Sequence, residues 1–146
     1  MQRIVDTVNN IVGAQGNVYL TLNGDLRLLS TFASLGEKVS PETAPFKLFG
    51  QDGFDGGAKY HVCWVWGIEG NDPGATTNNF TFLNTPNLVG RDEMVAVTLA
   101  HELTHFLSGS ASRGGAAHDK NQTDLMFPTY PHGIMMRKDR LKALIR

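Results

Sequence analysis

The sequence predicts an α+β fold, and three observations support this. An amphipathic helix is expected near the amino terminus, two apolar strand segments follow in the middle of the chain, and a second helix comes after them. The chain has 146 residues, of which 41% are hydrophobic. A chain of this size can bury one core and is too short for two ordinary domains. We therefore expect a single domain over residues 1–146.

The expected helices differ in the signals that predict them. In 2–13, apolar residues recur three and four positions apart. In 91–108, good helix formers follow acidic residues at the start, no Pro or Gly interrupts them, and Gly109 stands where a carboxyl-terminal cap belongs. A last helix is expected at about 138–145, where five basic side chains between Arg137 and Arg146 would form a solvated face.

Three segments read as strands. Residues 18–22 end at an Asn-Gly turn signal, 60–68 is apolar enough for a central strand, and 79–83 alternates in polarity. Residues 26–35 fit either a hairpin strand or a helix. The Gly-, Pro- and Asp-rich section 36–59 is expected to be mostly surface loop.

Composition excludes several classes of protein. The net charge is −1 and the pI is near 6.5, so we expect neither nucleic acid nor an anionic membrane as partner. No apolar stretch approaches the length of a membrane span, and the first twelve residues lack the apolar region of a secretory signal. The single cysteine, Cys63, lies in an apolar segment and is expected in the core, without an internal disulfide.

The most informative motif is His101-Glu102-Leu103-Thr104-His105, within the second expected helix. Residues four apart share one helix face, so the two imidazoles can point at one metal ion, and Glu102 can reach a water on that metal. If these histidines were only structural, four buried ring nitrogens would need other partners, which is costly. The motif predicts metal-assisted hydrolysis.

A catalytic zinc ion needs a third protein ligand. No Glu occurs after Glu102, which excludes the zinc peptidases whose third ligand is a glutamate on a later helix. The remaining downstream donors are His118, Asp119, Asp124, His132 and Asp139.

The motif and the segment 118–130 together resemble the metzincin clan of zinc endopeptidases, most closely the matrixins. In that family the third zinc-binding histidine is followed eight residues later by the methionine of a tight turn beneath the metal, and then by a Pro-x-Tyr segment. Here His118 and Met126 are eight residues apart, and Pro128, Thr129 and Tyr130 follow. The resemblance covers about 92–130.

The resemblance implies a role for each matching residue. The zinc ligands would be His101, His105 and His118, the general acid/base Glu102, and the turn residue under the metal Met126; Pro128, Thr129 and Tyr130 would border the pocket for the side chain after the scissile bond. The implied fold is a twisted mixed sheet with a backing helix and an active-site helix in 1–108. A small irregular subdomain with the methionine turn and a final helix would follow in 109–146.

The spacing between the second and third histidines departs from the family pattern. The family signature is H-E-x-x-H-x-x-G-x-x-H, whereas His118 comes thirteen residues after His105, so the connector 108–117 is enlarged by seven residues. Doubling a loop costs only about 0.6 kcal/mol, so the enlargement need not spoil the site. Asp119 is the alternative third ligand, because some metzincins use an aspartate there, and His132 is a more distant one.

These observations predict a zinc-dependent endopeptidase that acts on a peptide or protein substrate, which would pair with a strand edge within 75–83. The alternatives are a catalytically idle metzincin-like protein-binding module and a zinc hydrolase of a non-peptide amide. We expect one catalytic zinc, no second structural zinc, and a monomer; the resemblance favours a secreted protein. The acidic, Gly-rich stretch 51–57 is either a calcium site or, as we favour, a solvated turn.

Overall fold

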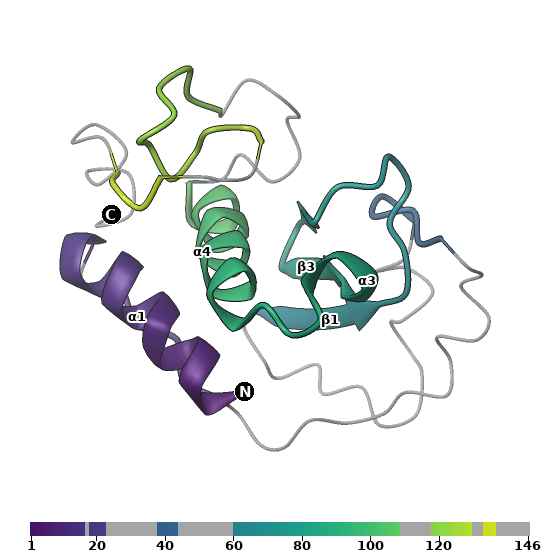
Figure 1. Cartoon of the computed structure of the whole chain (residues 1–146), viewed down its shortest axis with the longest axis horizontal. Coiled ribbons are helices and arrows are strands. Elements are labelled where there is room, and N and C mark those ends of the chain that lie inside the picture. Colours follow the sequence, from purple (N-terminus) through teal and green to yellow (C-terminus); the bar gives the residue numbers. More distant parts are fainter. Residues whose placement is uncertain (17, 23–37, 44–59, 109–117, 130–132, 137–146) are drawn as a thin grey trace.

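The structure is a computed structural model of the chain, and it describes residues 1–16, 18–22, 38–43, 60–108, 118–129 and 133–136. Its elements are, in order, α1 (Gln2–Gly16), β1 (His61–Val65), β2 (Gly74–Thr77), β3 (Phe80–Asn84), α3 (Thr85–Leu88) and α4 (Asp92–Leu107), as Figure 1 shows. The expected α+β class is confirmed. The predictions for 26–35, 51–57, Gly109 and the final helix at 138–145 lie outside the described residues.

Helix α1 forms where the spacing of apolar residues predicts it and runs three residues further. Its apolar stripe is buried against α4; the buried members are Ile4, Val5, Val8, Ile11 and Val12. Figure 1 shows α1 lying alongside α4, away from the sheet. The stripe therefore stabilises the helix that carries the histidines.

The strand predicted over 18–22 is wrong. These residues have no regular secondary structure, and the Asn9 side chain on α1 makes two hydrogen bonds with the backbone of Leu20. The amide group of Leu20 donates to Asn9 Oδ1 at 2.7 Å, and Asn9 Nδ2 donates to the Leu20 carbonyl at 3.0 Å. Val18 and Leu20 still pack against the core, so the apolar alternation reflects burial without a strand.

The described sheet is mixed and has the strand order β1-β3-β2. Strand β1 pairs with β3 in parallel, and β2 pairs with β3 antiparallel. Among the described strands the central one is therefore β3, in which every residue is buried. Strand β2, whose sequence Gly-Ala-Thr-Thr has little apolar character, was not predicted as a separate strand and overlaps only the strand edge expected within 75–83. Helix α3 was not expected either.

The two faces of the sheet bury separate sets of side chains, as the two-residue period of a strand requires. One face turns Val62, Trp64 and Leu83 toward the helices. The other face forms a second cluster, whose members are Val39, Cys63, Val65, Ile68, Phe80 and Phe82. Cys63 is a free, buried cysteine, as predicted, and burial raises the pKa of its thiol to about 12.

Helix α4 is enclosed on several sides. Every residue from 95 to 104 is buried, because α1 covers one side of the helix, the sheet covers another, and the segment that begins at His118 crosses its carboxyl-terminal end (Figure 1). In the part of the chain that is described, no helix is long and apolar enough to cross a membrane.

Backbone pairing and one side chain of α1 hold the carboxyl-terminal segment in place. Asp124 and Met135 form an isolated parallel bridge, and the Leu125 amide group donates to the Met135 carbonyl at 2.7 Å. Gln15 on α1 donates to the Ile134 carbonyl at 2.6 Å and accepts from the Met136 amide group at 2.7 Å. The segment that contributes His118 is thus anchored to the first helix.

We expect Gly133→Ala to destabilise this anchoring. A Cβ atom at Gly133 would lie 1.7 Å from the Thr123 carbonyl oxygen, and a main-chain atom cannot move aside as a flexible side chain can. Overpacking of this kind costs about 1–3 kcal/mol or more. Thermal unfolding measures the loss, with Thr129→Ala at an exposed position as control. Equal melting temperatures for the two variants would contradict the close approach.

Candidate metal centre

Helix α4 presents His101 and His105 on one face, one turn apart, as the sequence predicts. Their Nε2 atoms are 3.0 Å apart. The rings meet at 76°, with centroids 4.7 Å apart, so they approach edge to face and do not stack. His101 is only 3% exposed, because the segment after His118 covers it.

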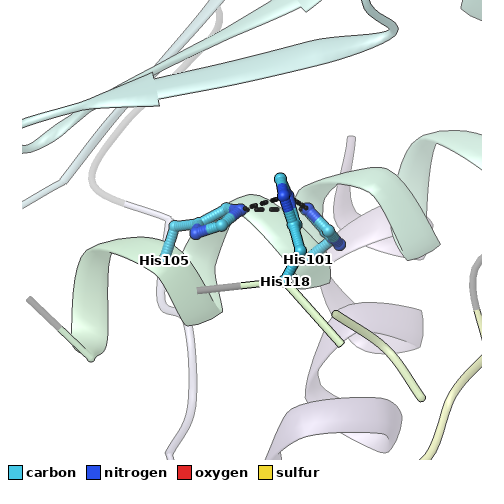
Figure 2. Close-up of side chains that lie close together, drawn as sticks. All are labelled: His101, His105 and His118. Atoms are coloured by element: carbon cyan, nitrogen blue, oxygen red, sulfur yellow. Dashed lines mark hydrogen bonds between the residues drawn. The ribbon is translucent and has the colours of Figure 1, made fainter. Parts of the chain in front are cut away.

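His118 completes a cluster of three imidazoles. Its Nε2 lies 3.2 Å from His101 Nε2 and 3.1 Å from His105 Nε2. In Figure 2 the three rings point their nitrogens at one another, with two rings from α4 and the third from the separate segment that begins at His118. The thirteen-residue spacing from His105 is therefore compatible with a common site.

The three nitrogens fit the ligand set of a small metal ion. Zinc–imidazole bonds are about 2.0–2.1 Å long, so two ligands of a tetrahedral ion lie about 3.3 Å apart. The three separations here are 3.0, 3.1 and 3.2 Å. Among the described residues, His101, His105 and His118 are the group that could hold a metal ion.

The hydrogen bond of His101 on its far side supports the same conclusion. Its Nδ1 lies 2.7 Å from the Leu125 carbonyl oxygen, which can only accept, so Nδ1 carries the proton. In the neutral ring Nε2 then has a lone pair that points into the cluster. This lone pair makes His101 Nε2 a possible ligand of a cation held between the three rings.

The turn that supplies the Leu125 carbonyl contains Met126. The Phe127 amide group donates to the Asp124 carbonyl at 3.1 Å, which closes the turn, and Met126 is fully buried. The Met126 amide group donates to Asp124 Oδ1 at 2.7 Å, while its carbonyl accepts from the Asp119 amide group at 2.7 Å. The turn is thus bonded to the residue that follows His118. The role of Met126 beneath a metal stays a prediction.

Glu102 lies beside the cluster on the side of α4 that faces β2. It is only 6% exposed. Burial raises the pKa of its carboxyl group to about 7, a hydrogen bond with Thr76 opposes this rise, and the charge of Asp72 adds to it. A carboxyl group with a pKa near neutrality can both take up and release a proton at physiological pH.

The other predicted site residues have different positions. Asp119, the alternative ligand, is not in the three-histidine group, and its Oδ1 accepts from the Asn121 amide group at 2.9 Å. Asp124 is buried and supports the turn. Pro128 and Thr129 are exposed, and no described contact places them at a substrate pocket. His132, Asp139 and Tyr130 lie outside the described residues.

Sequence reasoning missed three contributors to this site. The Leu125 carbonyl orients His101, and a main-chain atom leaves no residue-specific signal in a sequence. Gly74 and Thr76 of β2 lie against Glu102, but their segment was expected to be a turn followed by a strand edge.

A comparison of the sequence with protein-family models and with curated proteins finds no match.

Proposed function

We propose that this chain is a zinc-dependent endopeptidase of the metzincin type. One observation carries the proposal: three imidazole Nε2 atoms converge within 3.2 Å of one another, next to a buried glutamate. Three neutral nitrogen ligands and an adjacent carboxylate are the donor set of a hydrolytic zinc site.

His101, His105 and His118 would hold the ion. When bound, zinc would polarise the carbonyl group of a substrate and lower the pKa of a water molecule. The Glu102 carboxylate would take the proton of the attacking water and deliver it to the leaving amine. The Leu125 carbonyl would keep His101 in the tautomer whose Nε2 lone pair is available to the metal.

The position of β2 supports a peptide substrate. Strand β2 pairs with β3 on one side, and no other described strand pairs with it, so it is an edge of the described sheet. It lies close to α4, since a Cβ atom at Gly74 would be 3.1 Å from Glu102 Oε1. An extended peptide added to this edge would run past the glutamate, with its main chain bonded to the strand. Within the expected edge 75–83, we propose residues 75–77 of β2 as the part that would bind the substrate.

The test is a digest of a peptide library by the purified chain. We expect cleavage to stop after zinc is removed with a chelator and to return when zinc is restored, and metal analysis to find about one zinc per chain. Binding of zinc without cleavage of any peptide would contradict the peptidase proposal. A screen of non-peptide amides and a protein pull-down would then separate the two alternatives, a different amide hydrolase and a binding module.

A further inference from the structure

Three hydroxyl groups lie on the face of the sheet that packs against α4. Thr76 of β2 is directly opposite Thr81 of β3 in the antiparallel register, and their Oγ1 atoms are 2.5 Å apart. The Tyr60 hydroxyl group is hydrogen-bonded to Thr81 Oγ1. Thr81 is fully buried, so these groups form one hydrogen-bonded chain within the interface between the sheet and α4.

The chain of hydrogen-bonded hydroxyl groups ends at Glu102. Thr76 Oγ1 lies 3.4 Å from the Glu102 main-chain oxygen, and hydrogen bonding from the Thr76 hydroxyl group lowers the pKa of the Glu102 carboxyl group. Gly74, two residues earlier on the same face of β2, leaves the space that the carboxylate fills: a Cβ atom there would lie 3.1 Å from both Cγ and Oε1 of Glu102. The carboxylate is therefore seated against β2.

The available donors and acceptors fix the direction in which the hydroxyl groups donate their hydrogen bonds. A carboxylate and a carbonyl oxygen only accept, so Thr76 donates to Glu102. The Thr76 oxygen then accepts from Thr81, and the Thr81 oxygen accepts from Tyr60. Tyr60 remains a donor because burial raises the pKa of its phenol well above the usual value, and the charge of Glu102 adds to this rise. Each hydroxyl group thus donates toward the glutamate.

We infer that Tyr60, Thr81 and Thr76 are positioning residues, whose hydroxyl chain holds the Glu102 carboxylate in one orientation beside the three histidines. Its consequence for catalysis rests on the proposed function, whereas its effect on the carboxylate does not. Hydroxyl groups linked in this way polarise one another, so loss of the last donor weakens the hold on Glu102 more than loss of an isolated bond.

The first test compares Thr76→Val, which keeps the side-chain shape and removes the hydroxyl group, with Thr76→Ser, which keeps the hydroxyl group. In the zinc-loaded protein we expect Thr76→Val to lower kcat roughly 10- to 100-fold with KM and zinc affinity little changed, because a misplaced base slows the chemical step. Thr76→Ser should stay within about threefold of wild type. Thr7→Val is the matched control, since that hydroxyl group bonds the Arg3 carbonyl on α1.

The second test does not depend on catalysis. The chain has five Glu residues, so carbon-13 labelling of their side-chain carboxyl groups gives five resonances, and Glu102→Gln identifies that of Glu102. At fixed pH, Thr76→Val and Thr81→Val should shift this resonance, with or without zinc. Thr76→Ser and Thr7→Val should leave it in place.

An unmoved Glu102 resonance in Thr76→Val would overturn the inference. A Thr76→Ser variant that behaves like Thr76→Val would also overturn it. So would an active enzyme in which Thr76→Val and Thr76→Ser have the same kcat. If wild type binds zinc and cleaves nothing while the resonance shifts in Thr76→Val and Thr81→Val but not in Thr76→Ser or Thr7→Val, the positioning chain stands and the proposed function fails.

Discussion

Replacement of Glu102 by alanine is expected to lower peptide cleavage about 10²- to 10⁴-fold, the range that a general acid/base contributes. The three imidazole nitrogens that converge beside it do not depend on its side chain, so zinc affinity should stay close to that of wild type. Among the described residues no ion pair involves Glu102, so its removal should leave no buried partner charge unpaired.

The measurement combines kcat/KM on a cleaved peptide with zinc content and thermal unfolding. Glu93→Ala is the matched control, because Glu93 is an exposed acid in the first turn of the same helix. We expect that control to retain activity. If Glu102→Ala binds zinc, remains folded and cleaves at the wild-type rate, Glu102 is not the base and the mechanism is wrong.

The second large effect is expected from His118→Ala, which should weaken zinc binding by more than about 100-fold. Even residues that only support a metal ligand contribute roughly 10- to 100-fold, so loss of a ligand should exceed this. The remaining pair on α4, with Nε2 atoms 3.0 Å apart, would offer two of the three nitrogens. Competition against a zinc-binding dye measures the change.

Asp119→Ala is the control that decides between the two proposed third ligands. Its carboxylate caps the Asn121 amide group, and its own amide group, which bonds the Met126 carbonyl, survives the substitution. We expect this variant to bind zinc nearly as tightly as wild type. Thermal stability gives a second readout: zinc at 100 times its Kd stabilises a folded site by about 2.7 kcal/mol. Loss of this stabilisation in Asp119→Ala, but not in His118→Ala, would reverse the assignment.

Periodicity and local chemistry predicted the elements whose sequences have a clear helical or strand pattern. Helix α1 was predicted because its apolar stripe has a helical period, and α4 because it combines good helix formers with acidic residues at its start. The apolar segments around β1 and β3 were also recognised as strands. In α1, burial of one face against α4 produces the helical period of apolar residues.

Predictions of secondary structure failed where hydrogen bonds to residues distant in the sequence determine the conformation. Residues 18–22 read as a strand, but the Asn9 side chain occupies the backbone groups of Leu20. Strand β2 is a strand because β3 offers it an antiparallel edge, and Gly-Ala-Thr-Thr has little intrinsic preference that would reveal this. The central place of β3 depends on the same pairing.

The sequence alone determined the chemical content of the site: two imidazoles one helical turn apart and a glutamate between them, because an α-helix places residues four apart on one face. It also offered His118 as the third ligand, through its distance from Met126 in the family resemblance. Only the tertiary structure decided that His118 comes within 3.2 Å of His101, that the Leu125 carbonyl sets the tautomer, and that Thr76 bonds Glu102. These contacts join segments that packing brings together, and no local pattern encodes which long-range pairing has the lowest free energy.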